Sequence, residues 1–350
     1  MASKQITIKD IAKMANVSPG TVDRVIHNRG KVSDKAMAKV SVILEEIQYK
    51  PNVFAQSLKK QTSLRMAALV PYHSSDGFWS KAYEGIQKAF VDFEHLGVSI
   101  EIEEFNNKDV NDFVKKARTI LAENPNGLLI TPVFLKESLE VLKEFENSEI
   151  PFVTFNTFIP ELSSKSAIGQ DLKQSGRLAA SLIDQCRSDI SNVLVIHLGE
   201  NPGNAPHMME KESGFREYFK ESNPSIRIQS IEIPQTDQET INRILNKWSG
   251  DLRSVSGAYV TTAGAHHVAF TIKSRFEDSL VIGYDLIEEN INGLKAGTID
   301  FLINQNPFQS AYEGVSKLVD LLVFDKEVDK RMLMPLDIVN KENAAAYLNK

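Results

Sequence analysis

The chain has 350 residues, of which 42% are hydrophobic and 25% charged, as in an ordinary globular protein with two or three domains. No apolar run approaches the roughly 20 residues of a membrane-spanning helix, so we expect no membrane partner. The first residues lack the apolar core of a secretory signal, and Cys186 is the only cysteine. A single cysteine excludes an intrachain disulfide and a cysteine-rich metal site, and we expect a cytoplasmic protein.

Charge is divided unevenly between the start of the chain and the rest. Residues 1–60 hold 11 Lys and Arg against 5 Asp and Glu, whereas residues 61–350 hold 29 against 41. A basic head on an acidic body is typical of a module that binds a polyanion such as nucleic acid. Short windows also vary in charge by chance, so charge alone leaves nucleic-acid binding open.

Three short helical patterns occupy the first fifty residues. Thr7 begins the first as an N-cap, with an acidic residue three positions on. Ser18 caps the second, with Pro19 at its first position, and Ser33 caps a third that runs from Asp34 to about Gln48. Two short helices joined by a tight turn, completed by a third, predict a helix-turn-helix whose second helix enters the major groove. The alternative is a three-helix bundle with no role in DNA binding.

The residue identities in this head are more specific than its helical periodicity. Residues 7–18 read TIKDIAKMANVS, residues 21–25 read TVDRV and residues 49–52 read YKPN. In this order and spacing they resemble the LacI/GalR family of repressors, whose heads read T-(I/L)-x-D-(I/V)-A-x-x-A-x-V-S, then T-V-S-R-V, then Y-x-P-N. The resemblance implies a homodimeric transcription regulator, typically a repressor, that binds operator DNA. The head residues implied to meet DNA are Thr7, Ser18, Pro19, Gly20, Thr21, Asp23, Arg24, His27, Arg29 and Lys31.

The second helix departs from the family pattern. Asp23 stands where the family usually has serine, and Pro19 and Gly20 occupy positions that usually supply base-reading side chains. Direct readout therefore depends on Thr21, Arg24 and Asp23. For Asp23 three roles stay open: accepting from a cytosine amino group, repelling unsuitable sites, or orienting Arg24. Contacts to phosphates, which set register but not sequence, fall to His27, Arg29 and Lys31.

Residues 51–62 are expected to link head and body. Asn52 is placed to cap a short helix that has Ala55 and Leu58 on one face, and a helix this short is marginal in water. In the resembled family this segment is a hinge helix that pairs with its dimer mate, and a leucine matching Leu58 enters the minor groove and kinks the DNA. The alternative for Leu58 is a linker leucine packed on the body.

Residues 63–350 alternate short apolar runs with helical patterns. Strands are expected at 66–70, 98–105, 127–131, 151–155, 193–197, 226–233, 257–260 and 280–283, with helices between them, among them 79–94 and 110–122. This alternation predicts two α/β lobes, each a parallel sheet wrapped by helices. A ligand is expected where the carboxyl ends of the strands face each other across a cleft.

The loops after these strands carry the candidate effector contacts, which are Tyr72, Phe78, Trp79, Asn156, Lys211, Thr262, Asp285 and Gln305. They also resemble the periplasmic-sugar-binding-protein fold that serves the LacI/GalR family as its sensor. The resemblance implies that Phe78 and Trp79 flank a sugar ring, and that Asp285 and Gln305 bond its hydroxyls. It likewise implies that Asn156 and Lys211 contact the effector.

Other roles stay open for four of these residues. Trp79 is also suited to the core at a helix start, Asp285 to capping the helix that follows it, and Asn156 to holding a turn. Lys211 stands where the family often has arginine, and its point charge also suits a phosphate or carboxylate on the effector.

No pattern indicates an enzyme. The chain has no Gly-x-Gly-x-x-Gly, no Walker motif, no Gly-x-Ser-x-Gly and no His-Glu-x-x-His, and its seven histidines lack metal-ligand spacing. We therefore expect neither a cofactor nor a bound metal. A remaining alternative is a regulator whose body binds a protein co-regulator instead of a small metabolite.

Overall fold

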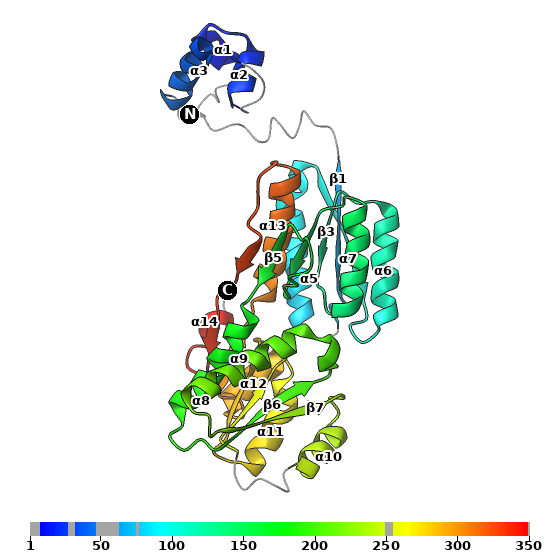
Figure 1. Ribbon diagram of the computed structural model, residues 1–350, viewed down its shortest axis with the longest axis vertical. Helices are drawn as coiled ribbons and strands as arrows, with labels where there is room; N and C mark the ends of the chain where they lie inside the picture. The colour runs from blue at the N-terminus through cyan, green and yellow to red at the C-terminus, as the bar shows by residue number, and fades with distance from the viewer. Residues whose placement is uncertain (1–7, 27–31, 47–62, 75–76, 249–254, 349–350) are drawn as a thin grey trace. The chain divides into compact units, whose positions relative to one another are not determined.

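The computed structural model describes residues 8–26, 32–46, 63–74, 77–248 and 255–348 (Figure 1). The chain divides into two units, a head within residues 1–61 and a body within residues 62–350. No helix of the described residues combines the length and the apolar composition needed to cross a lipid bilayer.

The head consists of α1 (Ile8–Ala15), α2 (Pro19–Ile26) and α3 (Asp34–Glu46). Their inward side chains form a small core of Ile11, Ala12, Ala15, Val22 and Val40. α1 ends where Asn16 adopts a left-handed φ of 51°, and the N–H of Val17 bonds back to the carbonyl of Ala12 at 3.0 Å. Asparagine tolerates this conformation, which reverses the chain between the two helices. The three predicted helices are confirmed as far as the described residues extend.

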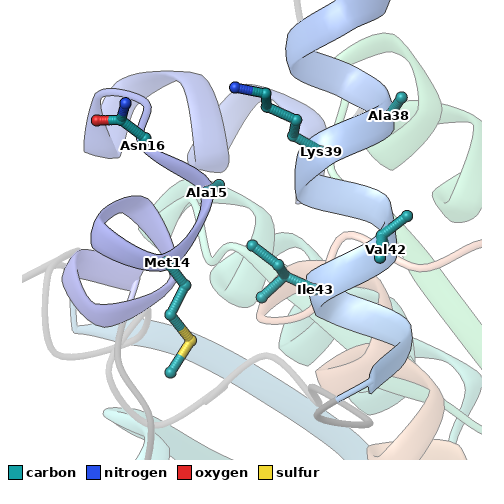
Figure 2. Close-up of a pocket in the computed structure, with 7 residues that line it drawn as sticks. All are labelled: Met14, Ala15, Asn16, Ala38, Lys39, Val42 and Ile43. Carbon is teal, nitrogen blue, oxygen red and sulfur yellow. The ribbon is translucent and has the colours of Figure 1, made fainter.

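A shallow cavity of about 470 Å³ lies between α1 and α3 of the head. Figure 2 shows the side chains that line it, which are Met14, Ala15, Asn16, Ala38, Lys39, Val42 and Ile43. All seven come from α1, α3 and the turn after α1, so the cavity does not include the exposed side chains of α2.

The first lobe of the body is a six-stranded sheet in the order β11-β5-β4-β3-β1-β2, with every neighbouring pair parallel. Figure 1 shows α5 and α13 on one side of this sheet, and α6 and α7 on the other. Its elements are β1 (Leu64–Pro71), α5 (Gly77–Phe93), η1 (Glu94–Leu96), β2 (Val98–Phe105), α6 (Val110–Glu123), β3 (Gly127–Ile130), α7 (Leu135–Asn147), β4 (Phe152–Phe155), β5 (Ser166–Gly169), α13 (Pro307–Leu322) and β11 (Arg331–Leu333).

The second lobe is a six-stranded sheet in the order β12-β10-β9-β8-β6-β7, in which only β12 runs antiparallel to its neighbour. One face packs on α8 and α9, and the other packs on α10, α11 and α12. Its elements are α8 (Leu172–Cys186), β6 (Asn192–Leu198), η2 (Pro202–Asn204), α9 (Pro206–Ser222), β7 (Arg227–Ile233), α10 (Gln238–Trp248), β8 (Gly257–Val260), α11 (Ala265–Arg275), β9 (Leu280–Tyr284), α12 (Glu288–Ala296), β10 (Phe301–Asn304), β12 (Asp337–Val339) and α14 (Ala345–Leu348).

The α8–α9 contact is made through glycine. A Cβ atom on Gly176 would lie 1.8 Å from the carbonyl oxygen of Lys211, and one on Gly214 would lie 1.8 Å from that of Lys173. Because only a residue without a side chain fits such a distance, the two helices meet backbone to backbone. This contact sets the position of α9 and of the side chains that it carries toward the sheet.

The chain passes between the lobes three times: after β5, after β10 and after β11. The first lobe is therefore built from two separate stretches, 64–169 and 307–333, and the second from 172–304 and 337–348. The predicted two-lobed α/β body with parallel sheets is confirmed.

Four short strands were not predicted: β5, β10, β11 and β12. Each has three or four residues, too few for alternation to be recognised, and β10 ends at Asn304 inside a stretch that the sequence suggested was a loop. β11 and β12 form because distant strands offer them partners, a long-range effect that local patterns do not contain.

Candidate DNA-binding helix and effector cleft

The N-terminal end of α2 is fixed by Ser18. Its hydroxyl accepts from the N–H of Thr21 at 3.1 Å and lies 2.9 Å from the hydroxyl of Thr21, as an N-cap should. Val22 is buried, whereas Asp23 and Arg24 are exposed, as are Pro19 and Gly20. The helix therefore presents Asp23 and Arg24 to the surroundings on the face opposite its core contact.

Several predicted DNA contacts lie outside the described residues. These are Thr7, His27, Arg29, Lys31, Asn52, Ala55 and Leu58. Their roles stay predictions.

In the body, Lys211 projects from α9 into the interior of the second lobe and is only 1% exposed. Its ammonium group donates to the carbonyl of Thr261 at 3.0 Å and to Oε1 of Gln305 at 3.4 Å, and it lies 3.5 Å from the centre of the Tyr284 ring. Burial lowers the pKa of Lys211 to about 8, against the opposing effect of the Asp285 carboxylate. The donors of Lys211 are thus directed at groups of the protein itself.

Asp285 and Gln305 form a two-point pair. One carboxylate oxygen of Asp285 accepts from the backbone N–H of Gln305 at 2.9 Å, and the other accepts from its side-chain Nε2 at 2.6 Å. Asp285 lies directly after β9 with a left-handed φ of 64°, and it is 2% exposed. The possibility that Asp285 caps the next helix is wrong, because the N-cap of α12 is Ile287.

A second set of hydrogen-bonded polar side chains includes His197 and Glu212. His197 of β6 is 3.0 Å from the hydroxyl of Thr261 through Nδ1 and 2.5 Å from the carboxylate of Glu212 through Nε2. Glu212 also accepts from Nε of Arg216 at 2.6 Å and from the hydroxyl of Ser230. Despite the opposing effect of burial, these donors together hold the pKa of Glu212 down at about 2. Thr261 is therefore held from both sides, by His197 at its hydroxyl and by Lys211 at its carbonyl.

The first lobe contributes aromatic side chains. Phe78 and Trp79 are 6% and 7% exposed, and their rings meet edge to face with centroids 4.7 Å apart. Trp79 also meets Phe155 at 6.5 Å, and all three belong to the core of this lobe. The structure therefore supports a core role for Trp79, which the sequence had left open.

Two other predicted effector contacts, Asn156 and Tyr72, belong neither to the polar network of the second lobe nor to the aromatic cluster of the first. Asn156 follows β4 with a left-handed φ of 72°, and its backbone N–H bonds the carbonyl of Ile168 on β5 at 2.8 Å, which extends the pairing of the two strands. Tyr72 follows β1 and is 41% exposed.

Two adjoining cavities open among the loops at the carboxyl ends of the strands. One of about 330 Å³ is lined by Asn106, Asn107, Lys108, Leu198, Gly199, Glu200, Thr236, Thr262, Ala263, Gly264, His266, His267 and Ile287. The other, of about 340 Å³, shares Asn107, Lys108, Gly199 and Glu200 with it. Both are lined from the two lobes, which places them in the predicted cleft. Of the predicted contacts only Thr262 is among the residues that line them.

The residues that sequence reasoning missed follow strands too. Asn107 and Lys108 come directly after β2, a strand whose bounds were predicted although its loop was passed over. His266 and His267 begin α11 with ring centroids 4.0 Å apart, and burial lowers the pKa of His267 to about 4. Applying the strand-end rule to the loop after β2 would have found Asn107 and Lys108, whereas the two histidines lie past the loop after β8, in the first turn of α11.

Comparison with known protein families gives two matches that together span the head and most of the body. Residues 67–326 match the periplasmic binding protein domain, and residues 7–52 match the bacterial regulatory proteins of the lacI family. The chain belongs to the LacI family of bacterial regulators. A LacI-family regulator is a DNA-binding transcription factor and not an enzyme.

Relatives of this LacI-family chain match along nearly its whole length. The ribose operon repressor of Lactococcus lactis subsp. lactis is 25% identical, over 96% of this chain and 97% of its own. The sucrose operon repressor of Streptococcus mutans is also 25% identical, over 96% and 98%. A crystal structure described as a LacI transcriptional regulator from Bacteroides fragilis superposes with a TM-score of 0.76 at 25% identity, over 82% of this chain and all of that one.

A transport protein shares the fold of the body. The glucose-galactose binding protein GanP from Geobacillus stearothermophilus superposes with a TM-score of 0.72 at 22% identity, over 81% of this chain and 99% of its own.

Within the described part of the chain, no group of three or more His, Cys, Asp or Glu side chains is arranged to hold a metal ion.

Proposed function

We propose that the protein is a cytoplasmic, homodimeric repressor whose cleft binds an uncharged sugar or polyol, and that occupancy of the cleft changes the affinity of the head for its operator. The observation that carries the effector class is the Asp285–Gln305 pair. A carboxylate paired with an amide offers acceptors and donors of the kinds that two neighbouring hydroxyls need. Relatives that repress ribose and sucrose operons support the same class.

The surroundings of Lys211 favour an uncharged effector over a phosphorylated one. Its ammonium group already meets Thr261, Gln305 and the Tyr284 ring, and burial lowers its pKa. A phosphate would have to displace these partners before it gained the lysine. Lys108 lines both cavities and is the cation that an anionic effector would meet first.

A thermal-shift screen tests the effector class. The purified protein is heated with D-ribose, sucrose, other pentoses and hexoses, polyols, sugar acids and sugar phosphates. A sugar at 100 times its dissociation constant should stabilise the body by about 2.7 kcal/mol. Asp285→Ala should abolish the shift, whereas Asp278→Ala, an exposed aspartate of the same lobe, should retain it. A shift with sugar phosphates alone would contradict the uncharged class.

For DNA binding, we infer that Arg24 reads a base. Once the operator has been selected from random DNA, Arg24→Ala should lower the affinity for it by about 1–3 kcal/mol while changing the affinity for random DNA little. Lys39→Ala on α3 is the matched control, because Lys39 is an exposed cation of the head that does not belong to α2. A uniform loss on both DNAs would mean that Arg24 contacts only phosphate.

The hinge and the dimer complete the proposal. Leu58→Ala should weaken operator binding while leaving sugar binding intact, because an apolar wedge acts only on DNA. Sedimentation of the purified protein should give a dimer, since two heads are needed to read a near-palindromic operator. Coupling between the cleft and the head is expected to be about 1–3 kcal/mol.

A further inference from the structure

One side chain joins all three passages between the lobes. Gln170 follows β5 on the first passage and is 5% exposed. Its Nε2 donates to the carbonyl of Asn304, on the second passage, at 2.8 Å, and to the carbonyl of Pro335, on the third, at 2.6 Å. Both donors of the amide are thereby used.

The bond to Asn304 reaches the effector pair through a single peptide group. The carbonyl that Gln170 holds belongs to the peptide between Asn304 and Gln305. The N–H of that same peptide donates to Asp285 at 2.9 Å, and the side chain of Gln305 bonds both Asp285 and Lys211. The orientation of this peptide plane is therefore fixed from one side by Gln170 and from the other by Asp285.

We propose that Gln170 is a positioning residue that transmits occupancy of the cleft to the arrangement of the lobes. This rests on the proposed function, in which an effector bonds Asp285 and Gln305. An effector that shifts this pair turns the Asn304–Gln305 peptide. Gln170 then carries the turn to the other two passages, so that the three move as one. Without the amide, the effector still meets its contacts, but the passages respond separately and the signal to the first lobe is lost.

The hydrogen bonding of the Gln170 side chain is compatible with two alternative arrangements of the lobes. Gln170 Oε1 is buried and has no hydrogen-bond partner among the described residues of the protein. A buried acceptor is costly to leave unpaired, so an arrangement of the passages that brings it a donor competes with this one. A single amide can in this way favour either of two lobe arrangements, and an effector then selects between them.

Hydrogen exchange tests the positioning without any effector. In Gln170→Met, which keeps the length but removes both donors, the Gln305 amide should exchange about 10-fold faster than in the wild type, because its peptide has lost one of two restraints. Gln174→Met, an exposed glutamine in the first turn of α8, should leave this amide unchanged. Unchanged exchange in Gln170→Met would overturn the proposal.

Gln170→Glu examines the donor chemistry. The carboxylate has nearly the same shape but presents only acceptors to two carbonyls, so exchange should be at least as fast as in Gln170→Met. A Gln170→Glu protein that behaves like the wild type would mean that the two donors are not used.

The functional arm measures sugar binding and signalling separately, with D-ribose as the probe. Wild-type coupling, the ratio of operator affinities with and without D-ribose, should fall within the usual range of about 5–150-fold. Gln170→Met should reduce it below about 2-fold while D-ribose affinity changes less than about 5-fold. A residue that merely supports the fold would lower thermal stability and leave the coupling ratio intact, and that result would overturn the inference. If D-ribose and the rest of the sugar panel fail to stabilise even the wild type, the proposed effector class is wrong, and the exchange experiment alone decides the role of Gln170.

Discussion

The interiors of the two lobes differ in chemistry. The interior of the second lobe contains a bonded polar network in which Lys211, Asp285 and Thr261 are each paired with other protein groups. The core of the first lobe holds the rings of Phe78 and Trp79. The buried hydroxyls of Thr131 and Thr154 in this lobe have no protein partner among the described residues. The second lobe thus fixes hydrogen-bond directions among its own buried groups, whereas the first is held together by apolar packing.

This difference predicts that the stability of the second lobe depends on single polar atoms. Glu212→Ala removes the acceptor of His197, Arg216 and Ser230 and should lower the free energy of unfolding by about 2–3 kcal/mol, because it leaves the buried His197 without its partner while Arg216 and Ser230 remain accessible to water. Urea unfolding followed by tryptophan fluorescence measures the body selectively, since both tryptophans, Trp79 and Trp248, lie in it.

The matched control for this change is Glu217→Ala. Glu217 lies on the same helix and pairs with Lys173 and Arg177 at the surface, where an ion pair contributes about 0–1 kcal/mol. Equal losses in the two variants would show that the network behind Lys211 does not act as a buried unit.

Alkaline pH should raise the stability of the folded body. Folding lowers the pKa of Lys211 from 10.5 to about 8, so between these values the unfolded chain binds the proton that the folded chain has released. Stability then rises with pH, by about 2 kcal/mol from pH 8 to 9.5. Above pH 10 the rise should be opposed by Tyr259 and Tyr284, whose pKa values burial raises.

Urea unfolding at several pH values checks this rise. Lys211→Met should abolish it, whereas Lys173→Met, at an exposed lysine, should leave it in place. A rise that persists unchanged in Lys211→Met would assign it to another group.

The smallest expected changes in unfolding free energy come from removing one buried hydroxyl in each lobe, and they compare the two lobes directly. Thr261→Val leaves His197 without its hydroxyl partner and should cost about 1–3 kcal/mol of unfolding free energy. Thr154→Val replaces a buried hydroxyl that has no protein partner among the described residues, and should be neutral or slightly stabilising. Both values come from the same unfolding assay. A comparable loss at Thr154 would mean that the first lobe also holds its hydroxyls in bonds.

Much of the scaffold follows from local patterns. The strand at 98–105 and the start of α2 at Pro19 lie where alternation and capping placed them, because both signals are carried by neighbouring residues. Asp285 and Gln305 were found by one rule, that ligand contacts follow the carboxyl ends of strands, and the structure brings the two together.

The rest depends on contacts between distant parts of the chain. That Lys211 is enclosed by Thr261 and Gln305 depends on where α9 lies. That position is decided by the close approach of Gly176 to the backbone of α9 and of Gly214 to the backbone of α8. Nothing near Gln170 in the sequence marks it, since its partners are 134 and 165 residues away. The roles of such residues can be recognised only once the topology of the fold is known.

The threefold passage between the lobes also determines the order in which they can be completed during synthesis. All of the second lobe's strands but β12 have been made by Asn304, whereas the first lobe still lacks α13 and β11. A Cβ on Gly85 would meet the carbonyl of Phe308 at 2.2 Å, so α5 has its close neighbour only after the ribosome has passed this residue. The half of the body that is started first is thus finished late, and its apolar faces on α5 and β3 stay uncovered for some 200 residues of elongation, about 10–40 s at bacterial rates of synthesis. A chain that stalls in this interval would expose a sheet ready to aggregate.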